Sequence, residues 1–223
     1  MIGHELDEVY LSQSGHMMFG EDFRYTPSRN FNFSLPSKKD DSTVWMSLSF
    51  ATKTTSVGYL DLTVNGENIS GNSRPTIGAT TGNNAANRIV SRKELSIEGT
   101  SLDLGITYSC SGVVNAANLD AIDLNYTANL EHNGTQTQFT LNSTAAKLAN
   151  ADGNVTVWDV TDPLNIVAMN TTATADGGLA WVNSYTVWRT YVAWNASSSF
   201  PQPQYVCAVP NQNLHGITDT PDM

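Results

Sequence analysis

Apolar and polar residues alternate in several stretches of this chain. Phe31, Phe33 and Leu35, for example, are separated by polar residues. The other alternating apolar sets are Val44, Met46, Leu48 and Phe50; Leu60, Leu62 and Val64; and Ile122, Leu124, Tyr126, Ala128 and Leu130. A period of two residues places one side of a segment in a core and the other in water. We therefore predict half-buried β-strands in all four stretches.

Glycine-containing turns separate these stretches. Asn65-Gly66 and Asn133-Gly134 tolerate the positive φ of a type I′ turn, so each predicts a β-hairpin. Further turn or break signals are Asp152-Gly153, Asp176-Gly177-Gly178, Pro163, Pro201 and Pro203. The chain is therefore expected to consist of many short strands.

The second half of the chain is rich in β-branched and aromatic residues, which favour strands. The only plausible helix is short, around STAAKLANA. Short strands that do not alternate with helices predict an all-β fold. We expect a two-sheet sandwich of Greek-key or jelly-roll type, and a small additional β subdomain at the N-terminus is compatible with this pattern. We expect one β-sandwich region over residues 1–223, with a long polar loop at 71–87. A domain boundary in that loop is the less favoured alternative.

The overall charge argues against a nucleic-acid partner. The chain has 11 Lys and Arg against 21 Asp and Glu, a net charge of -10, and no basic stripe. No apolar run approaches the roughly 20 residues that cross a bilayer, and no signal-peptide pattern opens the chain. Charged residues make up only 14% while Asn, Ser, Thr and Gly are abundant, a balance typical of exported β proteins. We interpret the chain as a mature or excised exported segment.

Cys110 and Cys207 match no zinc or redox spacing, so we expect no metal site and no cofactor. Both lie in strand-like stretches, ITYSC and YVCAV. Two alternatives stay open: a disulfide in an oxidising compartment, or two buried free thiols. Cys207 with His215 is the one pair that we considered as a catalytic nucleophile and base. The apolar neighbours of Cys207 argue against this role, because they raise the pKa of its thiol. We therefore expect no catalytic residue in this chain.

Other titratable residues have simpler explanations. His132 falls in the predicted turn EHNGT and is expected to be solvated, and His4 is expected to be mobile near the terminus. Asp120 with Asp123, and Asp152 with Asp159 and Asp162, lack the dense spacing of a calcium loop. The tryptophans, if exposed, could stack on sugar rings, although large aromatic residues in strands more often fill a core or an interface. The tryptophans are Trp45, Trp158, Trp181, Trp188 and Trp194.

Ordered segments along nearly the whole chain resemble one family. GHMMFGEDF at 15–23, with NFNFSLPS after it, resembles the start of the β-rich region that precedes the peptidase domain of PorU-type sortases in Bacteroidetes. GYLDLTVNGENI and GVVNAANLDAIDLNYTANL are similar to later segments of that region. VWDVTDPLNIVAM, WRTYVAW and PNQNLHGI resemble its last part, just before the gingipain-type peptidase domain. His16, Met17 and Ala121 depart from residues common in the family.

The resemblance implies a fragment whose peptidase domain would begin close to its C-terminus. The parent protein is then implied to lie at the outer membrane or cell surface, and to process type IX secretion cargo by removing sorting domains and joining cargo to lipopolysaccharide. No catalytic residue carries over. The implied partners are the downstream peptidase domain and either outer-membrane secretion components or secreted cargo.

Two functions follow as hypotheses: a non-catalytic structural and docking domain of such a sortase-like cysteine peptidase, or a surface carbohydrate-binding jelly-roll module. Aromatic residues gathered at the C-terminal edge favour docking, because Trp and Tyr bury large apolar area at interfaces. An aromatic strip exposed on one sheet face favours sugar binding. The residues we expect to dock are Trp188, Tyr191, Trp194, Tyr205 and Leu214.

Overall fold

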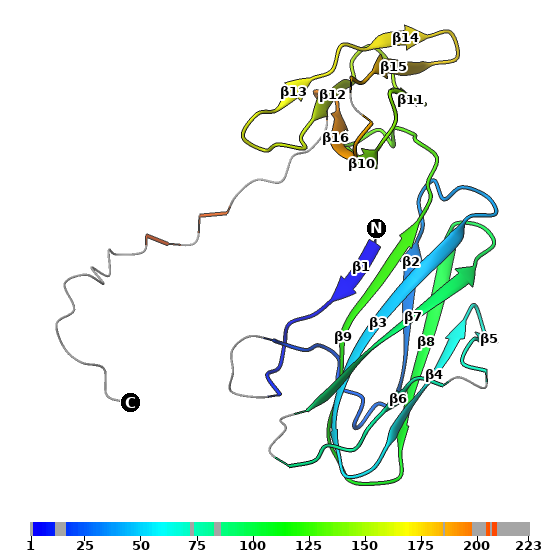
Figure 1. The fold of residues 1–223 in the computed structure, drawn as a ribbon, viewed down its shortest axis with the longest axis vertical. Helices are drawn as coiled ribbons and strands as arrows, with labels where there is room; N and C mark the ends of the chain where they lie inside the picture. The colour runs from blue at the N-terminus through cyan, green and yellow to red at the C-terminus, as the bar shows by residue number, and fades with distance from the viewer. Residues whose placement is uncertain are drawn as a thin grey trace, which may run out of the picture. The chain divides into compact units, whose positions relative to one another are not determined.

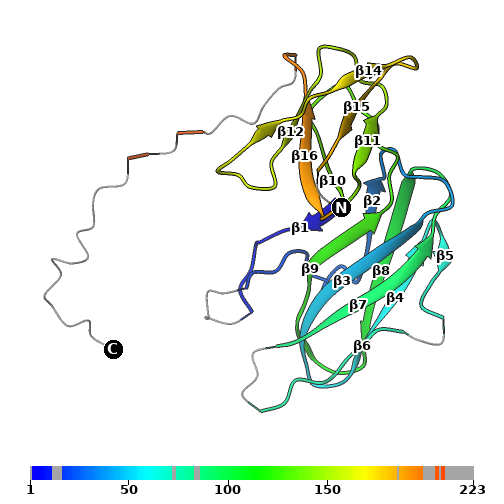
Figure 2. The same ribbon diagram turned by 45° about the horizontal axis from the view of Figure 1, so that its top comes forward.

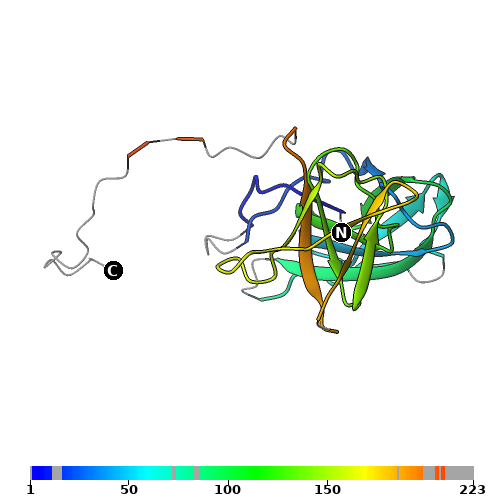
Figure 3. The ribbon, with the colours of Figure 1, turned by 90° about the horizontal axis from the view of Figure 1, so that it is seen from above.

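The computed structural model describes residues 2–11, 17–71, 74–82, 86–184, 186–197, 204–205 and 207–208. Every regular element in these residues is a β-strand, and Figures 1 and 3 show arrows without any coiled ribbon. Within this part of the chain no helix has the length and apolar character that crossing a membrane requires. The all-β prediction is confirmed. The chain divides into two compact units, Met1–Leu130 (unit 1) and Glu131–Met223 (unit 2).

Unit 1 is a sandwich of two antiparallel sheets. Its first sheet has the strand order β1-β9-β3-β7, and Figure 2 shows these strands side by side. They are β1 (Ile2–Glu5), β9 (Val114–Tyr126), β3 (Thr43–Thr54) and β7 (Asn87–Ser96). The second sheet has the order β2-β8-β4-β5, and β6 also pairs with β4. Its strands are β2 (Ser28–Ser34), β8 (Ser101–Cys110), β4 (Gly58–Val64), β5 (Glu67–Asn68) and β6 (Thr76–Ile77).

The alternating residues of the sequence build the core between these sheets. Phe31 and Phe33 on β2, and Leu60 and Leu62 on β4, are buried in one cluster with residues of β3, β8 and β9. Most connections cross from one sheet to the other, as in Greek-key and jelly-roll sandwiches. At the Asn65-Gly66 turn the φ angles are 50° and 86°, and Val64 pairs with Glu67. This type I′ hairpin is confirmed.

Unit 2 is built from two smaller antiparallel sheets. The four-stranded sheet has the order β10-β16-β12-β13 and the three-stranded sheet the order β11-β15-β14. The first contains β10 (Thr137–Leu141), β16 (Arg189–Trp194), β12 (Thr156–Asp159) and β13 (Val167–Ala168). The second contains β11 (Ala145–Leu148), β15 (Gly178–Val182) and β14 (Thr172–Thr174). Tilted aromatic rings join the two sheets, because Trp181 of the second contacts Phe139 and Tyr191 of the first.

Several sequence expectations differ from this architecture. The single region expected over residues 1–223 divides at 130/131, and the smaller unit lies at the C-terminal side. The long loop expected at 71–87 contains strand β6, which pairs with β4. STAAKLANA contains strand β11 instead of a helix, because its backbone pairs with β15. Asn133-Gly134 forms a turn but no hairpin: the side-chain oxygen of Asn133 accepts hydrogen bonds from Thr135 and Thr137, and β10 pairs with the distant β16.

Candidate functional site

The expected docking residues fall into different environments. Trp188, directly before β16, is 66% exposed, with exposed Val187 beside it, and Tyr205 is 80% exposed. Trp194 is half-buried at the end of β16. Leu214 lies outside the described residues. Trp188 and Tyr205 are therefore the two predicted residues whose side chains the structure leaves available to a partner.

Tyr191 belongs to the core of unit 2 and must be removed from the predicted docking set. Its side chain is 1% exposed and stacks on Phe139 at a centroid distance of 5.6 Å. The side-chain amide of Asn183 donates a 2.6 Å hydrogen bond to the tyrosine hydroxyl. Burial, aided by the charge of Asp159, raises the pKa of Tyr191. The sequence around Tyr191 gave no signal that separated it from exposed Trp188, three residues earlier.

Trp194 pairs with a second tryptophan on the outer face of the four-stranded sheet. Trp158 on β12 lies directly opposite Val192 on β16, and Thr156 lies opposite Trp194, so all four side chains share one face. The two indole rings meet edge to face at 4.7 Å. Val192, directly opposite Trp158 and two residues before Trp194, is buried. A T-shaped pair of this kind presents no continuous flat surface.

An ion pair at the start of β16 holds the backbone next to Trp188. The Nε of Arg189 donates to the Oδ2 of Asp159, whose side chain is 5% exposed. Burial raises the pKa of Asp159, but the hydrogen bonds from Arg189 and Thr161 outweigh it, so this pKa lies below its usual value. The carboxylate stays charged inside unit 2 and anchors the strand from which Trp188 projects.

The two cysteines are free thiols in the structure. Cys110 is half-buried at the end of β8, 3.2 Å from the hydroxyl of Ser56, whereas Cys207 is exposed and belongs to no strand. Burial raises the pKa of Cys110, but hydrogen bonds led by the one from Ser56 outweigh this effect and lower it overall. His215, considered as a base for Cys207, lies outside the described residues.

His132 is buried, contrary to the solvated turn expected from sequence. Its backbone N–H donates to the carbonyl of Ala149, and its Nδ1 lies 3.4 Å from the hydroxyl of Thr137. His4 is likewise not a mobile terminal residue: it sits in β1, and its Nε2 lies 2.6 Å from Glu21 Oε1. Burial lowers the pKa of His132, and the charge of Asp152 opposes this only in part.

Acidification is expected to destabilise unit 2 through His132. Because its folded pKa lies below the usual 6.5, the unfolded chain binds more protons once the pH falls below that value. Stability is fully present above about pH 6.5 and declines toward the folded pKa. Thermal unfolding of the wild type and His132→Asn between pH 7.5 and 5 measures this effect. Parallel pH profiles would contradict the assignment.

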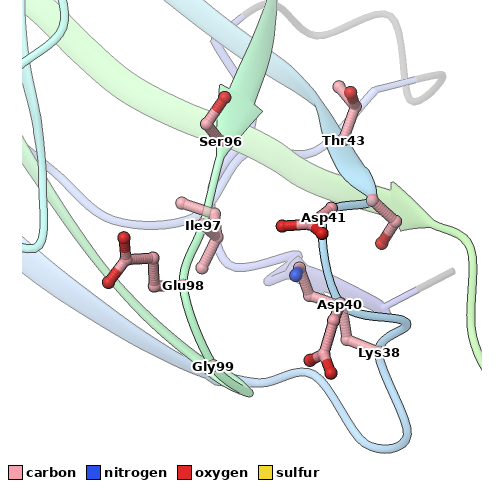
Figure 4. Close-up of a pocket in the computed structure, with 9 residues that line it drawn as sticks. Lys38, Asp40, Asp41, Thr43, Ser96, Ile97, Glu98 and Gly99 are labelled. Atoms are coloured by element: carbon pink, nitrogen blue, oxygen red, sulfur yellow. The ribbon is translucent and has the colours of Figure 1, made fainter.

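Carboxylates gather around a depression at one end of the unit 1 sandwich, but they form no metal cluster there. The depression has a volume of about 480 Å³. Figure 4 shows Asp40 and Asp41 from the β2–β3 connection and Glu98 from the β7–β8 connection, with Lys38 nearby. In the part of the chain that the structure describes, no three His, Cys, Asp or Glu side chains come together as a metal site would need. The depression offers polar contacts to a ligand and no group poised as an activated nucleophile.

Asp120, once considered as a calcium ligand, has protein partners instead. Its Oδ2 accepts a 2.6 Å hydrogen bond from Ser49 and two bonds from the guanidinium of Arg88, at 2.9 and 2.7 Å. The residue sits where the register of β9 against β3 shifts between Ser49 and Phe50. The carboxylate therefore pins a β-bulge, a structural role.

No protein-family model and no curated protein matches this chain. Among solved structures, the crystal structure of dimeric latent PorU from Porphyromonas gingivalis is similar, with a TM-score of 0.73 and 20% sequence identity. The match covers 96% of this chain and 22% of that chain, so this chain spans about a fifth of the length of that protein. Identity at this level is evidence for the fold alone. We conclude that the chain has a PorU-like, β-rich fold.

Proposed function

We propose that this chain is a non-catalytic structural and docking domain of a cell-surface, sortase-like cysteine peptidase that processes type IX secretion cargo. The match to one segment of PorU, across nearly all of this chain, supports its origin in such a protein. The ordered sequence segments that resemble the region before a gingipain-type peptidase domain support the same origin. On this proposal the chemistry belongs to the downstream peptidase domain, and the protein is exported to the outer membrane or cell surface.

The observation that carries the docking role is the exposure of Trp188. A tryptophan at 66% exposure leaves a large apolar area in water, and exposed Val187 precedes it. The Arg189–Asp159 pair fixes the backbone at the next residue, so the indole is presented from an ordered strand end. Such rigid aromatic anchors supply much of the binding energy at protein interfaces. Tyr205 adds a second exposed aromatic residue on the C-terminal side.

Trp188→Ala is expected to weaken binding to the separately expressed peptidase domain by about tenfold or more, as loss of an interface hot spot does. Isothermal titration calorimetry with the wild type and the variant measures the dissociation constants. Tyr25→Ala is the matched control, because Tyr25 is an exposed aromatic residue of unit 1. Equal affinities for all three chains, or no binding at high micromolar concentration, would refute the docking role.

A further inference from the structure

A tryptophan is exposed on an inner strand of one sheet of unit 1, near the end of that strand. Trp45 lies on β3, a central strand of the β1-β9-β3-β7 sheet, and its side chain is 47% exposed on the face opposite the core. In the register, Asn125 on β9 and Glu94 on β7 lie directly opposite it on either side. Residues opposite each other in antiparallel strands point to the same face. The indole therefore has an amide on one flank and a carboxylate on the other.

The next row of the same face combines small residues with opposite charges. Ser47 follows Trp45 on β3, with Asp123 of β9 and Arg92 of β7 opposite it. Beyond Asp123 lies Gly3 of β1, where an added Cβ would be 3.4 Å from the Asp123 carboxylate. Because Ser47 and Gly3 have small side chains or none, the sheet surface beside Trp45 is not covered by bulky groups. This face therefore presents the indole of Trp45 next to a polar strip formed by Asn125, Glu94, Asp123 and Arg92.

The charged groups of this strip have no protein partners among the described residues. The ion pairs formed by the described residues do not include Arg92, Glu94 or Asp123. Further along the same face, by contrast, Arg88 is bonded to Asp120. The carboxylates and the guanidinium around Trp45 therefore keep their hydrogen-bonding capacity for a ligand or for water.

We propose that this face binds a neutral glycan. One pyranose ring lies against the indole of Trp45 through its C–H face, and its hydroxyls bond to Asn125, Glu94, Asp123 and Arg92. Carboxylates accept hydrogen bonds from sugar hydroxyls, a guanidinium donates to them, and an amide does both. Two carboxylates against one guanidinium disfavour sulfated, phosphorylated or uronic-acid sugars. Charged groups are depleted from the centre of protein interfaces, which disfavours a protein partner at this face.

Affinity electrophoresis of the full 223-residue chain tests this site. Native gels would contain mannan, dextran, xyloglucan or mixed-linkage β-glucan as neutral probes, and alginate as an anionic probe. We expect at least one neutral polysaccharide to retard the wild type, and Trp45→Ala to weaken that binding at least tenfold. Arg92→Ala and Asp123→Ala are expected to weaken it less, and Tyr25→Ala to leave it unchanged. Thermal unfolding checks that each variant is folded.

Three results would overturn the proposal. These are no retardation by any neutral probe, equal retardation of the wild type and Trp45→Ala, and retardation by alginate alone. The site is independent of the docking role, because Trp188→Ala should bind glycan normally and Trp45→Ala should bind the peptidase domain normally. Failure of either function therefore leaves the other open to its own test.

Discussion

Phe50→Ala is expected to destabilise unit 1 by about 3–5 kcal/mol, the usual cost of emptying a buried aromatic site. Phe50 is fully buried on β3. Its ring meets Phe23 edge to face at 5.1 Å and stacks on Tyr108 at 5.7 Å. Alanine would remove both ring contacts and leave a cavity between the sheets, which packed strands can close only in part. Urea denaturation followed by far-ultraviolet circular dichroism measures the loss.

Two controls make the Phe50 result specific. Val113→Ala, at an exposed position in the β8–β9 connection, is expected to change stability by no more than about 0.5 kcal/mol. Hydrogen exchange should accelerate in β3 and β8 of the Phe50→Ala variant and stay unchanged in β16 of unit 2. Uniform acceleration in both units would show that they unfold together, against the division described above.

Arg189→Ala is expected to destabilise unit 2 by about 3–5 kcal/mol at neutral pH, because it leaves the Asp159 carboxylate buried without its cation. The amide N–H of Thr161 still donates to that carboxylate at 3.0 Å, which favours the lower end of the range. The double change Asp159→Asn with Arg189→Met should recover part of the loss, since it removes both charges together. Urea denaturation of the three chains gives the comparison.

The pH dependence separates this explanation from simple loss of packing. In the wild type the pKa of Asp159 lies below its usual 3.8, so its stabilising contribution is present above about pH 3.8 and is lost on further acidification. Without Arg189, only the hydrogen bonds from Thr161 still oppose the effect of burial, so the carboxyl pKa should rise. The cost of Arg189→Ala should therefore be smaller at pH 4.5 than at pH 7. An equal cost at both pH values would argue against an unpaired buried charge.

The sequence predicted the strands of unit 1 well because a two-residue period is a local property. Phe31, Leu48 and Leu62 occupy the buried positions that their spacing indicated. Strand pairing has no such local signal, since β3 pairs with β9 far along the chain. The division at 130/131 follows from which strands pair, so the local pattern gave no sign of it and a single region over residues 1–223 was expected instead. The expectation for His132 was wrong for the same reason, because its backbone N–H donates a hydrogen bond to the carbonyl of Ala149, a residue distant in sequence.

The candidate sites were only partly predictable. Clustering of aromatic residues near the C-terminus drew attention to Trp188 and Tyr205, whose side chains are exposed in the structure. It could not separate them from Tyr191, because on a short strand exposure depends on which face meets the second sheet. The face around Trp45 was harder still to foresee. Asn125, Glu94, Asp123 and Arg92 lie on two strands that flank β3, and only the register of three strands brings them together.

The position of β1 has a consequence for how this chain acquires its structure. Ile2 pairs with Leu124, so β1 can join its sheet only after the chain has been synthesised as far as β9. Loop closure over such a distance is slow, and sheets dominated by distant pairings fold over milliseconds to seconds. The N-terminal segment must therefore wait unpaired while β9 emerges. In unit 2 the described strands lie between residues 137 and 194, so its longest-range pairing, β10 with β16, closes a much shorter length of chain.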